Sequence, residues 1–107
     1  MRVFSGQRAW LLQRFTAIAI LVLLVLGAFT LVTTDGSAYE RWHAMATSTH
    51  GVVLVLAFFV SMGLHAWIGV RDVVLDYVHA PALRLPLLAV VAFVLIAVQI
   101  RVLMILT

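Results

Sequence analysis

His65 is the residue of this sequence whose type and surroundings point most directly to chemistry. It lies in a stretch, residues 44–70, that holds no charged residue, and it precedes Arg71 by six positions. In a helix, the imidazole would lie about 9 Å along the axis from that arginine. A histidine in such apolar surroundings is costly and usually faces protein or a cofactor. Axial ligation of haem iron is one role of imidazole, and a hydrogen bond between two helices is the plainer alternative.

Small residues share the predicted helix face of His65. Ala57, Ser61 and Gly69 lie at four-residue spacing on either side of it. Their small side chains would leave room for a flat macrocycle, and close packing of two helices explains the same pattern equally well. One histidine supplies one ligand. A six-coordinate haem would need a second ligand from another chain, because His50 lies about 22 Å away along the same helix.

Two arginines near the N-terminus are candidates for binding anions. Arg8 and Arg14 are six residues apart, and a long uncharged run begins directly after Arg14. Haem propionates are anionic and need cationic partners near the membrane surface, which these guanidinium groups could provide. The alternative interpretation makes Arg14 a topology anchor whose charged end extends to the lipid head groups.

Two acids and a tyrosine form a third polar group. Asp72 and Asp76 fall within about 20° of the helix face of His65, so pairing with arginines, including those of a partner, is expected. Tyr77 points about 120° away from that face and can donate a phenolic hydrogen bond. A tyrosine at a membrane interface is also a common lipid anchor, which is the alternative.

The composition is that of a membrane protein, so helices that cross the membrane would position these residues. Of the 107 residues, 65% are apolar and 10% are charged, and the mean hydropathy is +1.20. Soluble domains usually carry about 25% charged residues. The absence of cysteine excludes disulfides, thiolate metal sites and thioether-linked haem. The sequence contains neither a hydrolytic constellation nor a glycine-rich phosphate loop.

The sequence predicts an all-α, integral membrane bundle of three transmembrane helices in a single domain, residues 1–107. A span takes about 20 residues, and the uncharged stretches place the helices at about 10–33, 46–79 and 83–105. Asp35 and Gly36 form a turn after the first helix. Pro81 ends the second, and Pro86 is expected in the first turn of the third, where proline is tolerated.

Arginine placement predicts the orientation of the spans. One side of the membrane would carry five arginines and the other only Arg41 and Arg101; the five are Arg2, Arg8, Arg14, Arg71 and Arg84. Because basic residues concentrate on the cytoplasmic side, we expect a cytoplasmic N-terminus and a periplasmic C-terminus. The first apolar run is longer than a signal-peptide core and lacks a clean cleavage site. We expect a multi-pass protein of the bacterial inner membrane.

Several short runs resemble the hydrophobic membrane anchor of bacterial succinate dehydrogenase. The run HAWIG at residues 65–69 is followed by DYV at 76–78, and further similarity lies in RFTAI at 14–18 and LRL at 83–85. The resemblance covers essentially the whole chain. It implies a subunit of complex II that catalyses nothing alone and binds the cytochrome b, iron–sulfur and flavoprotein subunits. Together they would pass electrons from succinate to quinone in the tricarboxylic acid cycle and respiratory chain.

The resemblance also implies roles for individual residues. His65 would be one axial ligand of a haem b iron, with the other from the cytochrome b subunit. Arg14 would contact a haem propionate, and Arg8, which replaces a histidine of the enterobacterial form, would serve the same purpose. Tyr77 would donate a hydrogen bond to a carbonyl of ubiquinone, and Asp76 would hold an arginine of the cytochrome b subunit near that site.

Two other functions remain open at this point. The first is a small proton-coupled transporter or channel component that uses His65 and Asp76 as a proton relay. The second is the related anchor of fumarate reductase, which is disfavoured because some of those anchors lack a haem histidine.

Overall fold

The computed structural model describes residues 6–107, and all of its regular structure within them is helical. Arg2, one of the arginines used to predict orientation, lies outside the described residues. Three helices are long and apolar enough to cross a membrane, which confirms the predicted number of spans. The helices are α1 (Gly6–Thr33), α2 (Ala38–Thr47), α3 (Thr49–Tyr77) and α4 (Pro81–Leu106).

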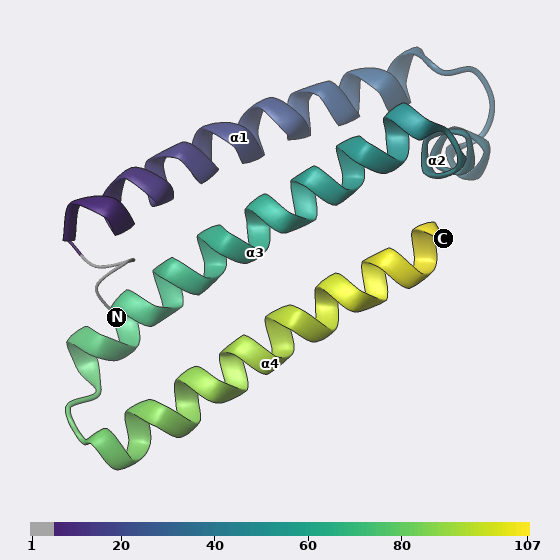
Figure 1. The fold of residues 1–107 in the computed structure, drawn as a ribbon. Coiled ribbons are helices and arrows are strands. Elements are labelled where there is room, and N and C mark those ends of the chain that lie inside the picture. The colour runs from purple at the N-terminus through teal and green to yellow at the C-terminus, as the bar shows by residue number, and fades with distance from the viewer. Residues whose placement is uncertain (1–5) are drawn as a thin grey trace.

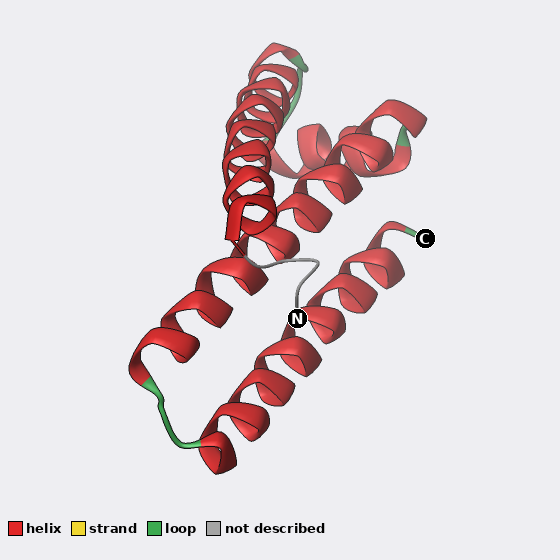
Figure 2. Cartoon of the chain, turned by 60° about the vertical axis from the view of Figure 1, so that its left-hand side comes forward, coloured by secondary structure: helices red, strands yellow, loops and turns green. Residues whose placement is uncertain are grey.

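Helix α3 is the centre of the arrangement. It packs against α1 on one side and α4 on the other, while α1 and α4 do not form a packed pair among the described helices. Figure 1 shows the three long helices as a row in which the start of α1, the end of α3 and the start of α4 share one end of the molecule. Figure 2 shows α1 crossing α3 at an angle while α4 runs alongside α3.

A short helix, α2, lies between the first two spans and was not predicted; a loop was expected over most of this segment. Ser37 caps the helix by accepting a hydrogen bond from the backbone N–H of Glu40 at 3.2 Å, and the Glu40 carboxylate accepts one from the Ser37 hydroxyl. The two residues match the Ser-x-x-Glu signature of a capping box, which is present in the sequence, but the Glu40 carboxylate accepts from the Ser37 hydroxyl and not from its backbone N–H. Gly36 precedes it at a φ of 112°, where a side chain would be strained.

The second span begins three residues later than predicted because Ser48 interrupts the helix. Its extended backbone separates α2 from α3, and its hydroxyl accepts from the N–H of Gly51 at 3.0 Å. A Cβ at Gly51 would lie 1.8 Å from the carbonyl oxygen of Met45. Glycine is therefore required where α2 turns sharply into α3.

The prolines lie differently from the prediction. Pro81 is the first residue of α4, so the third span starts two residues earlier than expected and the proline fits a position that needs no N–H. Pro86 is consequently inside α4 and not in its first turn, which corrects the prediction. The second span ends at Tyr77, close to the predicted end, with Val78 as its C-cap.

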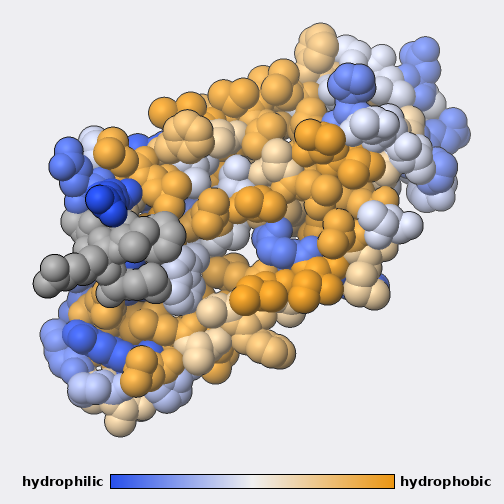
Figure 3. Space-filling view, in the orientation of Figure 1, coloured by the Kyte–Doolittle hydropathy of each residue, from blue (hydrophilic) through white to orange (hydrophobic). Residues whose placement is uncertain are grey.

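Most of the apolar surface of the described chain faces outward. Figure 3 shows hydrophobic residues along the length of the long helices and hydrophilic ones gathered toward the ends. The buried apolar residues are few: Ala9, Met45, Val55, Ile68 and Val74. In a membrane, helices pack against one another without burying apolar area from water, so a small core is sufficient there. The apolar surface that stays exposed on this chain must be covered by lipid or by a partner.

Candidate functional site

His65 lies between α3 and α1, half-buried, with both ring nitrogens directed at side chains of α1. Its Nδ1 atom is 3.1 Å from the hydroxyl oxygen of Thr16. Its Nε2 atom is 3.5 Å from the amide nitrogen of Gln13, which is at the limit of a hydrogen bond. Gln13 was not among the predicted site residues, and Thr16 entered the prediction only as part of a motif. Uncharged polar residues in an apolar helix were the signal that could have found both.

Thr16 is the most deeply buried polar residue of this cluster. Only 2% of its surface is exposed, and its hydroxyl lies 2.8 Å from the carbonyl oxygen of Leu12, one turn earlier in α1. Ala9, Gln13 and Thr16 are spaced so that they share one face of the helix. That face meets α3 at the level of His65.

The two ring nitrogens of His65 are engaged unequally. Of the two nitrogens of His65, Nδ1 is held by Thr16, whereas Nε2 has only the long contact with Gln13. The oxygen of the same Gln13 amide is buried and has no hydrogen-bond partner among the described residues. Gly69 lies one turn from His65, and a Cβ there would come within 3.5 Å of the Gln13 amide nitrogen. The site therefore has room for little more than a methyl group at residue 69, and Nε2 is the less firmly held nitrogen of the imidazole.

The N-terminal arginines are exposed and do not approach His65 within this chain. Arg14 lies about 100° around α1 from Gln13, so its side chain leaves a different face. Its guanidinium carbon sits 5.3 Å from the ring centre of Trp10, a cation–π distance. Arg8 is also exposed. Both guanidinium groups remain accessible to anions at this end of the molecule.

Arg71 is buried, which was not anticipated from the sequence. It is 8% exposed, and its Nε and Nη1 atoms have no hydrogen-bond partner among the residues that the structure describes. Its Nη2 atom lies 3.4 Å from a carboxylate oxygen of Asp72, whose side chain is 53% exposed. A buried guanidinium donor without an acceptor lowers the stability of the fold. We therefore expect an acceptor from outside the described residues to pair with this arginine.

The predicted quinone residues lie at the end of α3. Tyr77 is the last residue of the helix and is 78% exposed, and Asp76 beside it is also exposed. Neither side chain forms a hydrogen bond or ion pair among the residues that the structure describes. Any arginine that pairs with Asp76 and any ligand that contacts Tyr77 must approach from outside the described residues.

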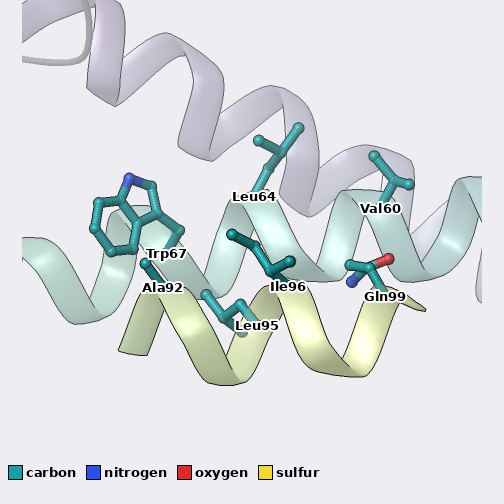
Figure 4. A pocket seen from close by; sticks show the side chains of 8 residues that line it. Val60, Leu64, Trp67, Ala92, Leu95, Ile96 and Gln99 are labelled. Atoms are coloured by element: carbon teal, nitrogen blue, oxygen red, sulfur yellow. The ribbon is translucent and has the colours of Figure 1, made fainter. Parts of the chain in front are cut away.

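An apolar groove of about 330 Å³ lies on the other side of α3, between α3 and α4. The groove is lined by Val60, Leu64 and Trp67 of α3 and by the α4 side chains Leu95, Ile96 and Gln99, which Figure 4 shows from close by. The Gln99 amide donates to the carbonyl oxygen of Phe59 at 2.7 Å. Gln99 was not singled out from the sequence, although a polar residue in the third span is itself a signal of helix contact.

Comparisons with known proteins match this chain to membrane subunits of one enzyme family. The model of the succinate dehydrogenase/fumarate reductase transmembrane subunit family matches residues 2–100, which include all of α1 and α3. The chain is also 31% identical over 91 residues to a protein of Coxiella burnetii named succinate dehydrogenase hydrophobic membrane anchor subunit. That match covers 85% of this chain and 79% of the relative.

Proposed function

This chain belongs to the succinate dehydrogenase/fumarate reductase transmembrane subunit family, and we propose that it is the hydrophobic membrane anchor of a succinate dehydrogenase. The name of the Coxiella burnetii relative supports this choice within the family. The anchor would hold the flavoprotein and iron–sulfur subunits at the membrane together with a cytochrome b subunit. Its exposed apolar helices and small core support an obligate role in a larger assembly.

His65 supplies one axial ligand of a haem b in this proposal. The observation that carries it is the unequal engagement of the two ring nitrogens, Nδ1 at 3.1 Å from Thr16 and Nε2 only at 3.5 Å from Gln13. A bound haem b would supply a one-electron store beside the quinone. The second ligand would come from the cytochrome b subunit, and Arg14 and Arg8 would bind the propionates.

Tyr77 and Asp76 contribute to the site where ubiquinone is reduced. Reduction of the quinone consumes two electrons and two protons, so a proton-carrying group must lie near its carbonyl oxygen. The exposed hydroxyl of Tyr77 can donate that hydrogen bond. Asp76 would hold an arginine of the cytochrome b subunit and so fix the partner against the end of α3.

The proposed orientation places this end of the molecule at the cytoplasmic face of a bacterial inner membrane. The start of α1, the end of α3 and the start of α4 share one end of the molecule (Figure 1). By the helix bounds, this end holds Arg8, Arg14, Arg71 and Arg84, whereas Arg41 lies in α2 and Arg101 near the end of α4. The excess of basic residues supports a cytoplasmic location for the first group. The soluble subunits would then dock where Tyr77 is exposed.

Purification of the tagged chain from membranes tests the proposal. We expect a flavoprotein, an iron–sulfur protein and a second membrane subunit to copurify, with a reduced-minus-oxidised b-type spectrum that His65→Ala abolishes. His50→Ala is the matched control, since it changes an exposed histidine at the other end of α3. The proposal would be overturned if the wild-type chain purified without these partners and without haem. If substitution of His65 or Asp76 also changed an ion flux, the proton-relay alternative would be supported.

A further inference from the structure

We propose that Thr16 fixes His65 in the tautomer that carries its proton on Nδ1, and so presents the Nε2 lone pair to haem iron. This inference rests on the proposed function, because it assigns a positioning residue to the proposed haem ligand. It concerns two residues of this chain that lie on different helices, so it also makes the packing of α1 on α3 a determinant of the haem site.

The single proton of the Thr16 hydroxyl decides the direction of its hydrogen bonds. The oxygen lies 2.8 Å from the carbonyl oxygen of Leu12, 3.1 Å from that of Gln13 and 3.1 Å from Nδ1 of His65. Two oxygen atoms at 2.8 Å repel each other unless a proton lies between them, and a carbonyl cannot provide one. The hydroxyl must therefore donate to the backbone of α1.

Other threonines of α1 show the same local bond. The hydroxyls of Thr30 and Thr33 each donate at 2.8 Å to the carbonyl four residues earlier. Donation to the preceding turn is thus the ordinary state of a threonine in this helix. What distinguishes Thr16 is that its oxygen, already a donor to Leu12, also faces an imidazole nitrogen.

The tautomer of His65 follows from that arrangement. Since the hydroxyl oxygen can only accept from the ring, Nδ1 must carry a proton. In the neutral imidazole the lone pair then lies on Nε2. Thr16 is 2% exposed, so no bulk water competes for the contact. Metal-binding histidines characteristically have their second nitrogen held in this manner, which orients the ring and raises its basicity.

Gln13 is compatible with this assignment. Its amide nitrogen lies 3.5 Å from Nε2 and can donate weakly to the lone pair. The amide oxygen has no partner among the described residues, so the side chain gives up little when it rotates away. Iron would replace this weak contact at Nε2 and leave the bond between Nδ1 and Thr16 intact.

The test compares three variants in the whole purified complex. Thr16→Val keeps the shape and removes the acceptor, Thr16→Ser keeps the hydroxyl, and Thr30→Val removes an equivalent hydroxyl that faces no imidazole. We expect Thr16→Val to raise the haem reduction potential, because a less basic imidazole stabilises ferric iron less. We also expect haem retention to weaken about ten-fold or more. The other two variants should match the wild type in both measurements.

The outcomes separate this inference from the proposed function. A wild-type complex that contains its partners but no haem would refute haem ligation by His65, the part of the proposed function on which this inference rests. A haem-containing Thr16→Val complex with unchanged potential and unchanged haem retention would refute the role of Thr16 alone. If Thr16→Val does not assemble, a density map of the unaltered complex decides the question. Nδ1 of His65 within hydrogen-bond distance of Oγ1 supports the inference, and separation of these two atoms overturns it.

Discussion

Arg84, in the first turn of α4, donates from Nη2 to the carbonyl oxygen of Leu75 at 2.9 Å and from Nε to that of Val78. These carbonyls lie at the end of α3, where helix geometry provides no N–H partner for them. The arginine thus ties the start of one span to the end of the other. It also fixes the turn that carries Asp76 and Tyr77.

Loss of this clamp should affect both stability and quinone reduction. We expect Arg84→Ala to cost about 1.5–3 kcal/mol, the usual contribution of hydrogen bonds to a charged donor, and to lower the thermal midpoint of the complex. Reduction of quinone should slow because Tyr77 loses its fixed position. Arg101→Ala is the control, since Arg101 is exposed near the other end of α4. Equal effects of the two changes would contradict the clamp.

The hydroxyl of Tyr77 is expected to act in quinone reduction and in no earlier step. Tyr77→Phe should slow quinone reduction about ten-fold, the factor that corresponds to a hydrogen bond of about 1.4 kcal/mol. Succinate oxidation with an artificial dye acceptor should persist, because that route bypasses the membrane site. Tyr39→Phe, at an exposed tyrosine of α2, should leave both rates unchanged. A parallel loss of both activities in Tyr77→Phe would exclude the proposed role.

Gln99 and Gly63 should be energetically coupled across α3 and α4. Gln99→Leu removes the bond to the Phe59 carbonyl, with an expected cost of about 0.6 kcal/mol and at most roughly 1.7. Gly63→Ala places a Cβ 2.9 Å from the Gln99 amide nitrogen and should displace the same amide. Unfolding of the single and double variants in detergent measures the coupling. Strictly additive costs would show that the two changes act separately.

Arg71 should find its acceptor only in the assembled complex. Its Nε and Nη1 atoms have no partner among the described residues, and leaving such donors buried costs about 1–3 kcal/mol each. We therefore expect Arg71→Met to lower the thermal midpoint of the complex, because it removes a charged donor that the partner pairs. Asp72→Asn is the comparison, as it weakens only the loose 3.4 Å contact. A rise in stability on Arg71→Met would mean that no acceptor is supplied.

The three spans were predictable because the lipid environment imposes them locally. A run of about 20 apolar residues must hydrogen-bond its own backbone, and a helix does so within one segment. Pro81 and the turn at Gly36 then set two of the ends. The short helix α2 was missed because apolar length was the criterion, and a ten-residue helix capped by Ser37 and Glu40 does not meet it.

The candidate site was only partly predictable. His65 was identified because a titratable residue within an apolar stretch is conspicuous in the sequence. Its partner Thr16 is 49 residues earlier, and no local pattern relates the two. Arg71 was interpreted as a topology charge, since arginines near a span end commonly extend to the surface. Its burial at 8% exposure became evident only once the helices were placed together.

The sequence by itself determined that the chain crosses a membrane three times and that the imidazole of His65 lies well inside the second span. Those properties follow from composition and from distances along a single helix. The tertiary structure decided which nitrogen of that imidazole is held, which polar residues face it, and which arginine is buried. Such facts depend on the rotation of each helix about its axis, and in a membrane this rotation is set by side-chain packing between helices.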